Sequence, residues 1–273
     1  MAVSGYTETA KRSGSSNILS RYYSSRFGLP LTLAVIIILV WELGARRVSP
    51  LLLTPLSKII QAWAEIISNG VLLNALAISL QSVFIGLGIA IIVGVGIGML
   101  MARYRPIEYF LNIYITFLLT TPMIAIIPVV VIFVGFTLTS RIIVVFLFSW
   151  IYILVNTFAG VRGTDPALLE MARSFGAKER HMFLKVILPS AMPAIMAGLR
   201  IGSARAVLGM LVSELLLATV GLGDLMIQYE NSFNNSYLFA VIFTIIVLGL
   251  IIVGFVAAIE KRVLSWRQAA TLD

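Results

Sequence analysis

Residues 165–189 read DPALLEMARSFGAKERHMFLKVILP and form the longest strongly charged segment of an otherwise apolar chain. Asp165 followed by a proline is typical of a helix start, because the side chain caps free N–H groups and the φ of proline suits the first turn. Gly176 is expected to end this first short helix in a left-handed conformation. Residues 177–187 predict a second short helix, basic and amphipathic, and Pro189 is expected to close the unit. The segment, called the knob below, therefore predicts two short helices that stand outside the apolar spans.

The composition indicates a membrane protein. Hydrophobic residues make up 60% of the 273-residue chain and charged residues 12%, far from the averages of soluble domains. The net charge of +8 would suggest a nucleic-acid partner in a soluble protein, but here the basic residues flank apolar spans and serve as topology signals. The absence of cysteine excludes disulfides, thiolate chemistry and cysteine-based metal sites.

Catalysis, metal binding and ATP binding have no signal in this sequence. The single histidine, His181, and the scattered carboxylates show no metal-ligand spacing. No Walker A sequence occurs, so we do not expect this chain to bind ATP by that route. No nucleophile–base pair or carboxylate pair stands out, and we predict no catalytic residue and no cofactor.

The predicted fold is an all-α, polytopic membrane protein with six transmembrane helices. Residues 1–28 form a polar, Ser-rich tail that lacks the apolar core of a cleaved signal peptide. Residues 29–267 form the membrane domain, and 268–273 a short C-terminal tail. An amphipathic run over 54–68 is too short and polar to span, and is expected at the outer interface. The six predicted spans are 29–45, 75–102, 107–136, 140–161, 190–217 and 237–259.

The distribution of basic residues predicts the orientation. With both ends inside, fourteen Lys and Arg fall on inside segments and four on outside segments, although Arg46 and Arg47 oppose the arrangement locally. The knob, between spans four and five, is then cytoplasmic, and residues 221–236, which hold no basic residue, are outside.

Two patterns within the spans concern packing and a possible path. Small residues recur at every fourth position in span two, which lets another helix approach closely. These small residues are Gly86, Ala90, Gly94, Gly98 and Ala102. Static packing is the favoured interpretation, and a moving contact is the alternative. The third span is interrupted at 120–122 and at Pro128, and Thr121 and Pro122 are candidates for a translocation path, because broken helices often line such paths; a harmless kink is the alternative.

The knob resembles the coupling loop of ABC importer permeases. The resemblance rests on Glu170-Met171-Ala172, on Gly176 and on 186–189, VILP. It departs at Met171, where the family prefers Ala, and at Val186, where it prefers Ile. The stretches 156–162, 197–202 and 213–223 resemble the nitrate/sulfonate/taurine branch, and the likeness runs over 29–267.

The resemblance implies a function and an assembly. In the family this loop, here residues 163–189, is a cytoplasmic coupling helix that docks on an ATPase, which binds ATP and Mg²⁺. Two permeases, as a homodimer or a pseudo-symmetric pair, two ATPase subunits and an extracytoplasmic binding protein would form the importer in the cell membrane, the bacterial inner or plasma membrane. The implied coupling residues are Leu168, Glu170, Ala172, Gly176, Ala177, Leu188 and Pro189.

Charged residues inside span five are further candidates for the path, because charges in lipid are costly. Arg200 and Glu214 share a helix face about 21 Å apart, and Arg205 lies about 140° round from Arg200. Each of these three side chains could face the path or could pair with a group on a neighbouring helix. The same two alternatives apply to Asn156. Arg200 and Arg205 favour an anionic solute, such as nitrate, a sulfonate, taurine, bicarbonate or a small aromatic acid.

Two other classes of function remain as alternatives. An ATP-independent secondary transporter would predict inverted repeats and ionisable groups for coupling ions, and no clear repeat is visible. A membrane scaffold without transport would not stimulate an ATPase.

Overall fold

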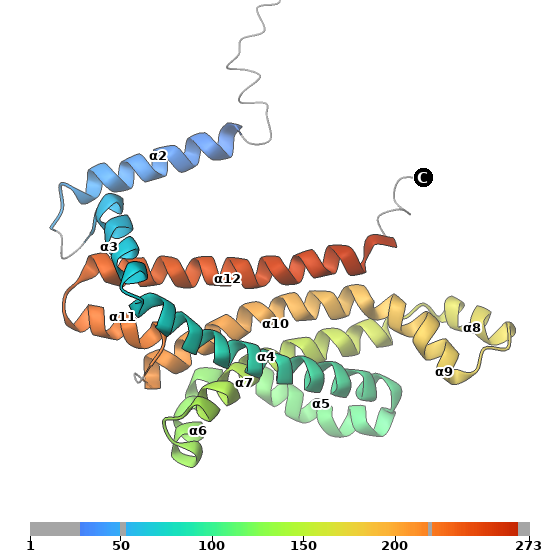
Figure 1. Cartoon of the computed structure of the whole chain (residues 1–273). Helices are drawn as coiled ribbons and strands as arrows, with labels where there is room; N and C mark the ends of the chain where they lie inside the picture. The colour runs from blue at the N-terminus through green and yellow to red at the C-terminus, as the bar shows by residue number, and fades with distance from the viewer. Residues whose placement is uncertain (1–27, 50–52, 218–219, 267–273) are drawn as a thin grey trace, which may run out of the picture. The chain divides into compact units, whose positions relative to one another are not determined.

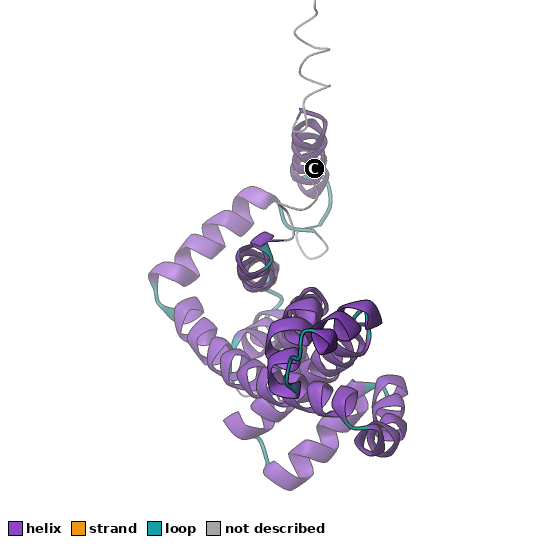
Figure 2. Cartoon of the chain, turned by 90° about the vertical axis from the view of Figure 1, so that its right-hand side faces the viewer, coloured by secondary structure: helices purple, strands orange, loops and turns teal. Residues whose placement is uncertain are grey.

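The computed structural model describes residues 28–49, 53–217 and 220–266, all of whose regular elements are helices (Figures 1 and 2). The predicted all-α class is confirmed. The chain divides into two units, residues 1–58 and 59–273. Apart from Gly28, the predicted polar tails lie outside the described residues.

The first unit contains α2 (Gly28–Ala45) and the start of α3 (Leu56–Ser68). Trp41 donates its indole N–H to the Thr54 carbonyl over 3.1 Å. Glu42 accepts hydrogen bonds from the backbone N–H and the hydroxyl of Ser57 at 3.2 and 2.9 Å. These bonds fix the start of α3, whose free N–H groups need an acceptor.

The second unit contains four helices long and apolar enough to cross a membrane. They are α4 (Val71–Arg103), α7 (Leu138–Arg162), the continuous helix Glu179–Leu217, which includes α10 (Leu188–Leu217), and α12 (Asn235–Val263). A fifth span exists if α5 (Arg105–Thr120) and the stretch Met123–Val134, bent by 98°, are one broken span. Because the apolar helix Pro30–Ala45 is shorter, the predicted count of six spans is not confirmed.

The third apolar stretch breaks where it was expected to. Thr121 is extended, with φ −75° and ψ 130°, because a residue before proline is driven out of the helical region. After Pro122 the chain continues as η1 (Met123–Ile126) and α6 (Ile127–Val134). Pro128 lies in the first turn of α6, where its missing N–H costs nothing; it starts a helix and does not break one.

The helix α7 is the centre of the second unit, with α4 and α10 packed on it through glycines. A Cβ on Gly94 of α4 would lie 2.8 Å from the Trp150 carbonyl oxygen, and one on Gly98 would lie 2.8 Å from that of Leu154. On α10, a Cβ on Gly202 would lie 2.6 Å from the Ile153 side chain. The small-residue stripe of span two therefore lies at a packed contact between two helices of the same chain.

The knob begins as the sequence predicts. Asp165 accepts a hydrogen bond from the Ala167 N–H over 2.9 Å and caps α8 (Pro166–Ser174). Gly176 follows with φ +73°, a conformation that glycine adopts without a steric penalty. Figure 1 shows α8 and α9 (Glu179–Met182) beyond the ends of the long helices.

The predicted end of the knob at Pro189 is wrong. The chain runs from α9 through a π-helical turn, η2 (Phe183–Ile187), directly into α10. Proline has no N–H, and its ring clashes with the carbonyl four residues earlier, here Lys185. The wider π-turn just before Pro189 accommodates this, so the second knob helix and span five form one bent rod.

A buried carboxylate joins four helices at the opposite end of the unit. Glu214 of α10 is fully buried, and its Oε2 accepts from the Ser79 hydroxyl of α4 at 2.9 Å and from the Gly223 N–H at 3.0 Å. The Ser79 hydroxyl in turn accepts from the Leu222 N–H at 3.0 Å. Arg141 Nη1 of α7 lies 3.8 Å from Glu214 Oε1. The fourth of these helices, which contains Gly223, is α11 (Leu222–Asn231). It lies within the predicted outer loop 221–236 and was not predicted as a helix.

We predict opposite effects for alanine at two glycines of α4. Gly94→Ala should lower the stability of the solubilised protein by about 1–3 kcal/mol, because the added Cβ meets backbone that cannot move aside. Gly88→Ala should be neutral or stabilising, since a Cβ there meets nothing within 4 Å. Thermal unfolding in detergent measures both, and equal midpoints would contradict the packing described for α4 on α7.

We also predict that Glu214→Ala destabilises the protein by about 3–5 kcal/mol, because it removes the negative charge beside buried Arg141 and the acceptor of the Gly223 N–H. Glu179→Ala is the control: it removes an ion pair with Arg103 whose side chains are 77% and 47% exposed, and should cost at most about 1 kcal/mol. The same unfolding experiment compares them. A loss at Glu214 no larger than at Glu179 would show that the buried carboxylate does not hold the four helices.

Candidate functional site

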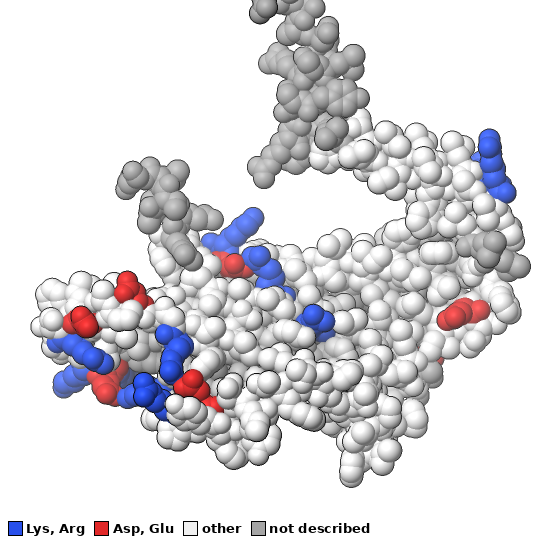
Figure 3. Space-filling view, turned by 180° about the vertical axis from the view of Figure 1, so that it is seen from behind, with Lys and Arg blue, Asp and Glu red and all other residues white. Residues whose placement is uncertain are grey.

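The predicted site residues lie in three separate places, namely the knob, a cavity near the middle of the spans, and other positions of α7 and α10. Figure 3 shows that Lys, Arg, Asp and Glu gather mainly at the knob end of the face in view. The three places are described in turn, because each offers different chemistry.

On the knob, three exposed apolar side chains belong to α8 and its end, and a fourth, Leu184, lies in η2. Leu168 is 38% exposed, Met171 53% and Phe175 85%. Glu170 is also exposed, and Gly176 is open, since a Cβ there meets nothing within 4 Å. This surface offers an aromatic and an aliphatic anchor to a partner protein.

Other predicted coupling residues are less accessible. Ala172 is buried within the chain at 8% exposure, and its carbonyl accepts from the Ala177 N–H at 3.0 Å. Leu188 and Pro189 are half-buried at the start of α10. Phe175 is not among the predicted coupling residues, and only its 85% exposure in the structure identifies it as a candidate.

Ion pairs connect the knob-side half of each long helix to a neighbour. Arg103 of α4 pairs with Glu179 of α9, and Arg200 of α10 pairs with Glu260 of α12. Arg162 of α7 pairs with Glu108 of α5 over 2.6 Å. Arg200 is thereby held away from the cavity described next. Of the two alternatives that the sequence left open, it pairs with a neighbouring helix and does not face the path.

A cavity of about 270 Å³ lies near the middle of the spans, where α5 breaks beside α7 and α10. Thr121 lines it at the break, and Arg205 lies near the middle of α10. The remaining lining is mostly apolar and comes from Leu118, Leu119, Met123, Ile124, Phe148, Ile151, Tyr152, Leu208 and Val212. The structure thus brings together Thr121 and Arg205, two of the six predicted path residues.

Arg205 differs from the other arginines of the long spans in its partner. Its guanidinium carbon lies 4.8 Å from the centre of the Tyr152 ring, a cation–π contact that holds the side chain without neutralising it. In the described part of the chain no carboxylate lies within ion-pair distance of Arg205, whereas Arg141 lies beside Glu214 and Arg200 beside Glu260. Sequence reasoning missed Tyr152, because nothing in its spacing marks it.

The other predicted path residues do not line this cavity. Pro122 is adjacent to Thr121 in the chain and supplies the break. Asn156 donates its amide to the Tyr152 carbonyl of its own helix over 2.8 Å. Glu214 is buried among the four helices described above. Among the described residues no three His, Asp or Glu side chains could hold a metal ion.

Comparison with known proteins agrees with this architecture. Residues 94–265 match the family described as binding-protein-dependent transport system inner membrane component. A putative aliphatic sulfonates transport permease of Bacillus subtilis (strain 168) is 31% identical over 241 residues, which cover 88% of this chain and 87% of the relative. A riboflavin transport system permease of Chloroflexus aurantiacus is 29% identical, covering 92% of this chain and 94% of the relative.

Solved structures share the fold. An amino acid ABC transporter crystallised with histidines matches 73% of this chain and 97% of its own, with a TM-score of 0.61 and 19% identity. A methionine ABC transporter in an inward-facing conformation matches 68% of this chain and 93% of its own, with a TM-score of 0.56 and 21% identity. By the family match and the sulfonate relative, the chain belongs to the inner membrane permeases of binding-protein-dependent ABC importers.

Proposed function

We propose that this permease carries a small organic anion across the membrane, and that the anion passes Arg205. The observation that supports the proposal is an arginine with no carboxylate partner among the described residues, near the middle of a span, in a cavity with mostly apolar walls. An ionisable group at that depth is costly, and such groups commonly mark substrate paths. The broken span beside it supports the same reading, since transporter sites often use interrupted helices.

The solute class follows from the two kinds of surface in the cavity. A guanidinium binds planar or tetrahedral oxyanions through several N–H groups. The apolar walls suit a short carbon chain or ring next to that anionic group. A sulfonate or carboxylate with an apolar part fits both, and the similarity to an aliphatic sulfonate permease adds support.

ATP and Mg²⁺ would be bound by a separate ATPase that docks on the knob in the cytoplasm. The exposed side chains of Leu168, Met171 and Phe175 would enter its surface. Closure of an ATPase pair would move α8, and the rod from Glu179 to Leu217 would carry that movement into the spans. Two permeases, as a homodimer or a pseudo-symmetric pair, would enclose the path, and an extracytoplasmic binding protein would supply the solute.

We predict that Arg205→Gln lowers uptake of an alkanesulfonate at least about tenfold, because hydrogen bonds to a charged group contribute about 1.5–3 kcal/mol. Arg205→Lys, which keeps the charge, should retain part of the uptake. Radiolabelled uptake in cells and ATPase activity of the purified complex are measured together. If Arg205→Gln loses complex assembly as much as uptake, Arg205 is structural; if uptake is unchanged, the anion does not pass it.

We predict that Phe175→Ser weakens co-purification of the ATPase about tenfold or more, since burying such a ring contributes about 1.5–3 kcal/mol. Gly176→Val should have a similar effect, because a β-branched residue is strained at φ +73°. His181→Ser, at an exposed position of α9, is the control and should behave like the wild type. Wild-type co-purification and wild-type uptake in both variants would show that the knob is not the coupling element.

A further inference from the structure

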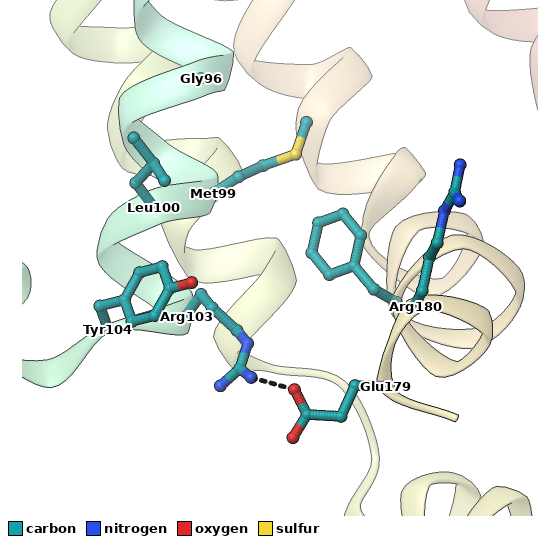
Figure 4. Close-up of a pocket in the computed structure, with 8 residues that line it drawn as sticks. Gly96, Met99, Leu100, Arg103, Tyr104, Glu179 and Arg180 are labelled. Atoms are coloured by element: carbon teal, nitrogen blue, oxygen red, sulfur yellow. Dashed lines mark hydrogen bonds and ion pairs between the residues drawn. The ribbon is translucent and has the colours of Figure 1, made fainter. Parts of the chain in front are cut away.

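A second cavity, of about 560 Å³, lies between the end of α4 and the start of the helix that enters α10. It is separate from the mid-span cavity, with which it shares no residue. Figure 4 shows its lining, with Arg103 and Glu179 joined by their ion pair and Arg180 directed away from that pair. Nothing in the proposed transport cycle uses this cavity.

The lining changes from apolar to charged along α4. Gly96, Met99 and Leu100 come first, and Arg103 and Tyr104 follow at the end of the helix. From position 96 to 103 the helix rises about 10 Å. With the end of α4 at the membrane surface, the apolar part would lie at the depth of acyl chains and the charged part at the depth of headgroups. A tyrosine at this boundary is typical of the membrane interface.

The charge at the rim favours an anion. Arg103 is paired with Glu179, so these two side chains nearly cancel. Arg180, in contrast, has no carboxylate within ion-pair distance in the part of the chain that the structure describes. Arg180 thus adds one uncompensated positive charge to the lining of a cavity that is otherwise apolar or charge-paired.

We infer that this cavity binds an anionic phospholipid, with its phosphate at Arg180 and an acyl chain along Gly96, Met99 and Leu100. The inference rests on the proposed orientation, which places the cavity at the cytoplasmic leaflet, where anionic lipids and basic pockets between helices meet. A free phosphate ester would satisfy Arg180 and leave the apolar floor in contact with water. A bound lipid would touch both α4 and the knob, and would favour the arrangement in which they are close.

The test is a direct count of bound lipids on the full-length permease. The protein is exchanged into nanodiscs containing equal amounts of phosphatidylglycerol and phosphatidylcholine, and native mass spectrometry counts each class that stays bound. The wild type should enrich phosphatidylglycerol. Arg180→Gln should lower that enrichment about fivefold, the change that one basic residue gives at a charged membrane surface.

A second variant tests the apolar floor without touching charge. Gly96→Leu should displace the acyl chain, and it should fold, because a Cβ at Gly96 meets nothing within 4 Å. Gly88→Leu is its matched control on the same helix, with the same free space and no place in the cavity. Arg262→Gln, an exposed charge at the end of α12 outside the cavity, is the control for Arg180→Gln.

Three results would overturn the inference. They are equal retention of both lipids by the wild type, unchanged enrichment in both cavity variants, or displacement of phosphatidylglycerol by soluble glycerol phosphate, which would identify a phosphate-ester site instead. The count is independent of transport. A wild-type protein that enriches phosphatidylglycerol but imports no anion would contradict the proposed function and leave the lipid site intact.

Discussion

The fold depends on the carboxylate of Glu214 being buried with its donors in place. A carboxylate taken out of water without partners is very costly. Here the Ser79 hydroxyl, the Gly223 N–H and the nearby Arg141 charge offset that cost, and each comes from a different helix. Removing α4 or α11 would take a hydrogen-bond donor away from the buried carboxylate. Gly221 is part of the same constraint, because any Cβ at its φ of +97° would collide with the carboxylate.

The knob end of the molecule is held together in a weaker way. Its three ion pairs involve arginines whose side chains are 46–47% exposed, and pairs of that kind contribute at most about 1 kcal/mol each. They can be broken and remade at little cost. One end of the bundle is thus fixed by buried polar bonds and the other by exchangeable ones, an arrangement consistent with the proposed docking of an ATPase at the second end.

Much of this could be predicted from the sequence, because the signals were local. The Asp165 cap, the turn at Gly176 and the break before Pro122 each depend on one residue and its neighbours, and all three are present. The glycine stripe of α4 indicated a close helix contact, though only the structure identifies α7 as the other side.

What could not be predicted includes two contacts between distant parts of the chain and one local turn. Only the fold brings Arg141 to Glu214. Tyr152 has no sequence signal, and its role follows from the position of Arg205 on another helix. Pro189 was expected to stop a helix, since the sequence gives no sign of the π-turn that absorbs it.

That π-turn makes a lever of the chain from Glu179 to Leu217. The arm between the knob end and the contact of Ala191 with Gly160 on α7 is about 18 Å long at 1.5 Å per residue. A tilt of about 10° around this fulcrum would sweep the tip of the arm by ~3 Å. If the helix ended at Pro189, the connection there would be flexible. It would absorb a displacement of the knob before that displacement reached the membrane interior.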